Sequence, residues 1–193
     1  VVLAGEELVA GAAQERDAAI LMLDIRGFTG MASRVSPRNV VELLTGLHAR
    51  IIPIVRRHGG AVDKFLGDGI MITFGAVTPS KTAAADALRA LDEIMTMAVT
   101  WEAEAPNHGL PRPLEVNGAV VAGQVVFAVL GASDRLEYTV IGTPVNLAAK
   151  LEKHNKVEGT RALTTFGTYR RAVHQGYTRA PPGEQRPARS VAD

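Results

Sequence analysis

Short apolar runs alternate along the chain with longer stretches in which apolar residues recur every three or four positions. The run Ile20–Asp24 is apolar up to its final aspartate, which predicts a strand buried on both faces. Residues 36–58 and 82–102 show helical spacing and predict two long helices. Ser36 offers a capping hydroxyl to the first of these helices, and Pro37 takes its first helical position.

Two apolar strands within residues 62–75 are predicted to form a hairpin, because Gly67-Asp68-Gly69 separates them and Asp-Gly favours tight hairpin turns. Further strands and one more helix are predicted at residues 114–121, 124–130, 136–141 and, for the helix, 143–155. This order predicts an α+β fold with a ferredoxin-like βαββαβ core. Its sheet is expected to be mainly antiparallel, with the helices packed on one face.

The pattern weakens toward both ends of the chain. Residues 1–17 lack a sustained apolar face and are predicted to be a linker or the end of an upstream signalling helix. Residues 181–193 contain three prolines, which predicts a C-terminal loop or a strand cut short. Residues 18–180 are therefore expected to form a single folded domain.

Composition narrows the class of protein. The 193 residues are 47% hydrophobic and carry a net charge of +1, which supports a folded globule and gives no sign of a nucleic-acid surface. The absence of cysteine excludes disulfides and thiolate chemistry and fits a cytoplasmic location. No apolar run approaches the roughly 20 residues of a membrane helix, so we expect no direct membrane contact by this fragment.

The chain begins with valine, and no basic stretch followed by an apolar one, the pattern expected of a signal peptide, opens the given sequence. We therefore expect it to be a piece of a longer protein, whose remaining segments could include a membrane anchor.

Two aspartates stand at predicted strand ends beside glycines. Asp24 ends the first strand and precedes Arg26-Gly27, and Asp68 lies in the hairpin turn. An isolated Asp-Gly pair is usually explained by the turn alone. A second carboxylate in a similar position favours another interpretation, since two such groups can hold a pair of hard cations.

Three separated segments carry a family resemblance. The segments D-I-R-G-F-T at 24–29, K-F-L-G-D-G at 64–69 and Y-T-V-I-G-x-x-V-N-L-A-A-K at 138–150 resemble the class III nucleotidyl cyclase catalytic domain, of the bacterial type. The resemblance extends from about Ala19 to Tyr169. It implies that residues 18–180 are a catalytic domain that converts a nucleoside triphosphate into a cyclic nucleotide and pyrophosphate.

The same resemblance implies a set of metal and phosphate ligands. The side chains of Asp24 and Asp68 and the carbonyl of Ile25 would bind two divalent cations, Mg²⁺ or Mn²⁺. The triphosphate would be held by backbone N–H groups of the glycine-containing turn, namely those of Gly27, Phe28 and Thr29.

The resemblance implies that Lys64 and Thr139 recognise the base. Lysine is only a donor, so Lys64 suits the acceptor N1 of adenine and opposes the protonated N1 of guanine. Thr139 departs from the aspartate common in animal adenylyl cyclases, and its hydroxyl can either donate or accept. We therefore expect ATP as substrate, and we keep a guanylate cyclase that uses GTP as the alternative.

Two residues of the last predicted helix complete the implied site. Asn146 matches the asparagine that orients the ribose, and Lys150 stands where the family has an arginine that stabilises the transferred phosphate. Lysine keeps the charge but loses the planar pair of donors, so the substitution affects catalytic rate more than nucleotide binding. A non-catalytic nucleotide-binding or dimerisation module is the second alternative, with Lys64 and Lys150 as ordinary surface residues.

The resemblance also implies an assembly. One active site in the family takes its metals from one subunit and its base, ribose and transition-state groups from the other. Because this chain carries both sets, a head-to-tail homodimer with two equivalent sites is implied, controlled by an upstream regulatory or sensor domain. The family's terminal-phosphate lysine has no clear equivalent beyond the positional candidates Arg186 and Arg189, and the apolar run Val125–Val129 has no functional explanation.

Overall fold

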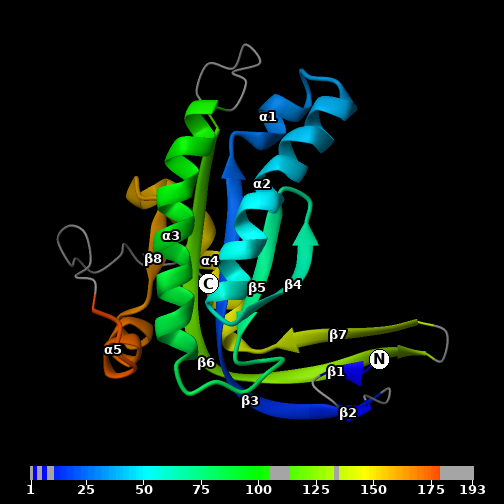
Figure 1. Ribbon diagram of the computed structural model, residues 1–193, viewed down its shortest axis with the longest axis vertical. Helices are drawn as coiled ribbons and strands as arrows, with labels where there is room; N and C mark the ends of the chain where they lie inside the picture. Colours follow the sequence, from blue (N-terminus) through cyan, green and yellow to red (C-terminus); the bar gives the residue numbers. More distant parts are fainter. Residues whose placement is uncertain (1, 4–5, 8–10, 105–113, 133–134, 179–193) are drawn as a thin grey trace.

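The computed structural model describes residues 2–3, 6–7, 11–104, 114–132 and 135–178. Its elements in chain order are β1 (Val2–Leu3), β2 (Glu6–Glu7), β3 (Ala13–Arg26), α1 (Phe28–Ala32), α2 (Pro37–Arg57), β4 (Gly60–Leu66), β5 (Gly69–Phe74), α3 (Ala83–Glu104), β6 (Glu115–Ala132), β7 (Arg135–Ile141), α4 (Thr143–Glu158), β8 (Ala162–Thr164) and α5 (Phe166–His174). The main sheet has the order β4-β5-β3-β6-β7, and β8 pairs in parallel with β6 (Figure 1).

The predicted α+β core is confirmed. The succession β3-α2-β4-β5-α3-β6 is a βαββαβ unit, and every pairing along the main strand order is antiparallel. Ser36 caps α2 as predicted, because its hydroxyl accepts a hydrogen bond from the Asn39 backbone N–H at 3.3 Å. The helix ends at Arg57, just before the glycines that were expected to stop it.

The helices of the βαββαβ core, α2 and α3, lie on one face of the sheet as predicted, and α4, which follows that core in the chain, covers the other face. Ala19, Leu21 and Leu23 of β3 pack in one cluster with α2, α3 and α5, and the alternate residues Ala18, Ile20 and Met22 pack in another with α4. Figure 1 shows α2 and α3 across the front of the sheet and α4 behind it. A central strand that is apolar on both faces needs a cover on each side.

β3 begins earlier than the sequence predicted. Ala13 to Asp17, assigned to a linker or an incoming helix, pair with Ala128 to Gln124 of β6 and continue the strand that leads to Asp24. The polar side chains of residues 13–17 are compatible with a strand, because this part of β3 extends beyond the helices that cover the sheet. None of these side chains is fully buried. The prediction for residues 1–17 is thus wrong from Ala13 onward.

β6 is one long strand where two were expected. Ala122-Gly123 does not interrupt it, and a Cβ on Gly123 would come within 2.9 Å of Pro144 in α4, so the glycine makes room for a helix. The unexplained run Val125–Val129 pairs with β3 on one side and β7 on the other, and Val125, Phe127 and Val129 are buried. Its role is structural.

The C-terminal loop or strand predicted for residues 181–193 lies outside the described residues, as do Arg186 and Arg189. Within the part of the chain that is described, no helix combines the length and the apolar character needed to cross a bilayer.

Candidate active site

A cavity of about 350 Å³ opens where the C-terminal end of β3 meets the β4–β5 hairpin. It is lined by residues of β3 and the turn that follows it, the hairpin, β6 and α4: Asp24, Ile25, Arg26, Gly27, Phe28, Thr29, Gly30, Asp68, Asn117, Glu152, Lys153 and Lys156. The structure therefore brings together the predicted metal-binding and phosphate-binding residues, which come from two segments about 40 positions apart in the sequence.

Asp24 and Asp68 face each other closely enough to interact. Burial first, and then the negative charge of Asp24, raise the pKa of Asp68 to about 6 from its ordinary 3.8. Gly69 permits this approach, since a Cβ at that position would lie 3.2 Å from the Leu23 carbonyl oxygen and 3.6 Å from Asp24 Oδ1. The result is a half-buried carboxylate pair of the kind that hard cations prefer.

The turn after β3 owes its shape to Gly27. Its φ of 88° lies in the left-handed region that other residues rarely adopt, and it lets the chain reverse from the strand into the short helix α1. Met31 N–H donates to the Gly27 carbonyl at 3.1 Å and closes the first turn of that helix. The backbone of residues 27–30 thereby lines the cavity beside the two carboxylates.

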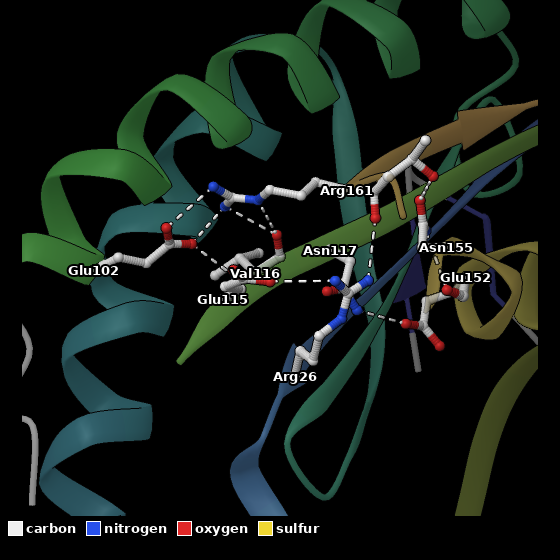
Figure 2. Close-up of polar contacts among 9 residues, drawn as sticks. Arg26, Glu102, Glu115, Val116, Asn117, Glu152, Asn155 and Arg161 are labelled. Carbon is white, nitrogen blue, oxygen red and sulfur yellow. Dashed lines mark hydrogen bonds and ion pairs between the residues drawn. The ribbon is translucent and has the colours of Figure 1, made fainter. Parts of the chain in front are cut away.

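Six further lining residues were not among the predicted site residues: Arg26, Gly30, Asn117, Glu152, Lys153 and Lys156. Asn117 lies opposite Asp24 in the β3–β6 register, and its Nδ2 donates to Glu152 Oε1 at 2.9 Å (Figure 2). Burial, together with the charge of Asp24, raises the pKa of Glu152, and the Asn117 hydrogen bond opposes that rise. Asn117 could have been found only by aligning β6 with β3, because that alignment places it opposite Asp24.

A polar network behind the cavity fixes these residues (Figure 2). Arg26 forms an ion pair with Glu115 at 3.2 Å and donates to the Thr160 carbonyl at 3.1 Å. Asn155 Nδ2 donates to the Gly118 carbonyl at 3.0 Å and joins α4 to β6. The cavity wall is thus tied to β3, β6 and the end of α4 at once, which limits its movement.

The remaining predicted residues do not line this cavity. Lys64 Nζ donates to Thr139 Oγ1 at 3.0 Å, so the two residues expected to read the base are in direct contact. Asn146 and Lys150 both lie exposed on α4, one turn apart. The structure therefore separates the candidate metal and phosphate residues from the candidate base, ribose and transition-state residues.

This sheet order, with a carboxylate at the end of β3 facing another in the next hairpin, agrees with the expectation of a nucleotidyl cyclase domain. The adenylate and guanylate cyclase catalytic domain matches residues 11–171, and the chain belongs to that family.

Curated relatives extend well beyond this chain. Uncharacterized protein Rv1318c of Mycobacterium tuberculosis is 37% identical over 138 residues, covering 72% of this chain and 24% of its own length. Uncharacterized protein Rv1319c of the same organism is 34% identical over 158 residues, with 80% and 27% covered. The chain thus spans about a quarter of the length of these relatives.

Solved structures of an adenylyl cyclase and of a guanylyl cyclase are both similar to this chain. The adenylyl cyclase CyaB from P. aeruginosa has a TM-score of 0.73 and 26% identity, with 84% of this chain and 83% of that chain covered. The guanylyl cyclase Cya2 has a TM-score of 0.73 and 29% identity, with 85% and 81% covered. Similarity of this degree establishes the nucleotidyl cyclase class and does not choose between ATP and GTP.

Proposed function

We propose that this chain is an adenylate cyclase catalytic domain, which converts ATP into 3′,5′-cyclic AMP and pyrophosphate. The observation that carries the proposal is the facing pair Asp24 and Asp68 in a cavity shared with the backbone of residues 27–30. In the reaction the ribose 3′-oxygen forms a bond to the α-phosphorus, the bond from that phosphorus to the bridging oxygen breaks, and pyrophosphate leaves with that oxygen. The hydroxyl proton passes to solvent.

The carboxylate pair fits two divalent cations, Mg²⁺ or Mn²⁺. Burial first, and then the charge of Asp24, raise the pKa of Asp68 to about 6, so the two half-buried acids are an unfavourable pair alone. Cations would remove the repulsion between them. Asp24, Asp68 and the Ile25 carbonyl would hold the cations. When bound, these cations would lower the pKa of the 3′-hydroxyl and neutralise the triphosphate charge.

The chain's own groups bind and orient the nucleotide. The N–H groups of Gly27, Phe28 and Thr29 hold the phosphates in the turn after β3. Asn146 orients the ribose, and Lys150, one turn further along α4, places a positive charge near the phosphate under attack. No nucleophilic side chain is required by this chemistry.

Contact between Lys64 and Thr139 supports ATP over GTP. The Lys64 ammonium donates to the Thr139 hydroxyl oxygen and has a further N–H group for adenine N1, an acceptor. The Thr139 oxygen can still accept from the adenine amino group. Guanine presents a donor at N1, which faces an ammonium unfavourably. The similarity to the guanylyl cyclase Cya2 keeps GTP as the second candidate substrate.

We also propose a head-to-tail homodimer. The cavity of one chain contains the candidate metal and phosphate residues without the candidate base, ribose and transition-state residues, so a second copy would complete each site and two equivalent sites would form. The larger size of the mycobacterial relatives supports an upstream sensor or regulatory domain. Use of ATP implies the cytoplasm as the compartment of this domain.

The deciding experiment offers ATP and GTP separately to concentrated protein with Mn²⁺, with Asp68→Ala as the control. Cyclic AMP from ATP that disappears in the control is the expected result. Cyclic GTP as the main product would instead establish the guanylate cyclase. No product from either nucleotide, with dimers demonstrated by light scattering, would favour a non-catalytic nucleotide-binding module.

A further inference from the structure

Asp63 is a buried carboxylate that the proposed reaction does not use. Its side chain has 0% exposure, and apart from Lys64 neither carboxylate oxygen has a hydrogen-bond partner within the described part of the chain. Burial raises the pKa of Asp63, and the neighbouring Lys64 ammonium, 3.2 Å from Asp63 Oδ2, lowers it. A buried charge is costly unless it is paired, so the position requires an explanation.

A β-bulge brings Asp63 and Lys64 together. Consecutive side chains of a regular strand point to opposite faces of the sheet. In β4, however, Val62 pairs with Ile72 and Lys64 pairs with Met71, so Asp63 is an extra residue without a partner in β5. The irregularity allows two neighbouring side chains to meet, and it aims Lys64 at the face covered by α4, to which Met71 also belongs.

Residues of β7 enclose this pair from the other side. Lys64 donates to Thr139, and the Tyr138 hydroxyl donates to the Val62 carbonyl at 3.0 Å, directly before the bulge. Burial and the charge of Asp63 raise the pKa of Tyr138, while the exposed Glu137 adds a further negative charge to the surroundings of Asp63. The Lys64 ammonium is therefore held between a carboxylate and a hydroxyl that come from different strands.

We infer that Asp63 is a positioning residue that fixes the Lys64 ammonium beside Thr139 and thereby sets the preference for one purine base over another. The inference rests on the proposed function, because it gives the selectivity of that site a physical origin. With two of its three N–H groups directed to Asp63 and Thr139, Lys64 presents the remaining donor in a defined direction. Without the carboxylate, the long side chain regains its rotamer freedom and the donor loses that direction.

The test compares Asp63→Asn with the wild type, because asparagine keeps the volume and removes the charge. We expect kcat/KM for ATP to fall about tenfold, mainly through KM, while kcat/KM for GTP changes less. The ratio of kcat/KM for ATP to kcat/KM for GTP should therefore fall severalfold, by up to about tenfold. Glu137→Gln is the matched control, since it removes one exposed negative charge from the same neighbourhood and should leave the ratio unchanged.

A double-mutant cycle shows whether Asp63 acts through Lys64. In a Lys64→Met background, Asp63→Asn should change the ratio no further. The inference is overturned if Asp63→Asn alone leaves the ATP-to-GTP ratio of kcat/KM unchanged. It is also overturned if Asp63→Asn changes that ratio equally in the wild-type and Lys64→Met backgrounds. A uniform loss with both nucleotides and a lower melting temperature also overturns it, because that result indicates a structural role.

Equilibrium binding of ATP and GTP in the presence of Mn²⁺ provides a second readout. A wild-type chain that binds nucleotide but makes no cyclic product contradicts the proposed function, and the binding ratio still decides the role of Asp63. A wild-type chain that binds neither nucleotide overturns both.

Discussion

At the scale of single residues, the site owes its properties to charges held at close range. Asp24 and Asp68 are brought together by a glycine that tolerates the contact, and Asp63 and Lys64 by an irregularity in strand pairing. The first pair was predictable from turn chemistry and motif. The second was not, because a bulge is defined by strand register, which becomes visible only when β5 is laid against β4.

Asp68→Asn should stabilise the metal-free protein near neutral pH. The pKa of Asp68 in the folded chain, about 6, exceeds its ordinary 3.8, so the folded state holds a proton that the unfolded state releases. This contribution to stability is present at low pH and is lost as the pH rises from about 4 to about 6. Asparagine avoids the penalty, and after allowance for solvent screening we expect a gain of about 1–2 kcal/mol at pH 7.5.

Thermal unfolding in EDTA at pH 4.5 and pH 7.5 checks this prediction. The two proteins should melt together at the lower pH and separate at the higher one. Added Mn²⁺ should raise the melting temperature of the wild type more than that of the variant. A wild type that is more stable than Asp68→Asn at pH 7.5 without metal would contradict the electrostatic interpretation.

Lys150→Arg should increase turnover. A guanidinium offers two parallel donors to phosphate oxygens, whereas the ammonium is a point charge on a flexible stem. We expect kcat to rise about tenfold with little change in KM, measured with ATP and Mn²⁺. Lys81→Arg is a suitable control, because Lys81 is exposed in the connection between β5 and α3. A lower kcat in Lys150→Arg would show that the site is built around lysine.

At the scale of elements, strand pairing determines where some strands begin, which the local sequence alone does not predict. The apolar centre of β3, the cap of α2 and the hairpin were all predictable, because each follows from residues close in the chain. The start of β3 at Ala13 was not predictable, since Gln14-Glu15-Arg16-Asp17 has low strand propensity and becomes a strand by pairing with β6. Asn117 and Glu152 enter the cavity through that same pairing and through the packing of α4.

Gly142→Ala should disturb α4. Gly142 precedes the helix with a φ of 152°, and a Cβ there would lie 3.2 Å from the Gln124 carbonyl oxygen. We expect a loss of about 2 kcal/mol in the free energy of unfolding, measured with urea. Gly46→Ala within α2 is the matched control and should be neutral or stabilising, because alanine is the better helix former. Equal effects of the two substitutions would show that Gly142 is not constrained.

At the scale of the whole molecule, the division of the site between two groups of residues predicts complementation. Asp24→Ala removes a metal-binding carboxylate and Asn146→Ala removes the proposed ribose contact, so each protein should be inactive alone. Mixed heterodimers would contain one intact site and one doubly defective site. We therefore expect up to about half of the wild-type activity per heterodimer, detected as cyclic nucleotide formation.

The control for complementation is a mixture of Asp24→Ala with Asp68→Ala, which damage the same half of the site and should not restore activity. A mixture of Asp24→Ala and Asn146→Ala chains that stays as inactive as either parent, although the chains exchange, would rule out shared sites.

The continuity of β3 also has a mechanical consequence. From position 13 to position 24 the chain makes one uninterrupted strand, about 36 Å long at ~3.3 Å per residue. Pairing with β6 along its whole length and with β5 over Ala19 to Leu23 keeps it from stretching or buckling. The strand is therefore stiff along its length. Tension or torsion applied at Ala13 is transmitted to Asp24 and changes the separation between the Asp24 and Asp68 carboxylates.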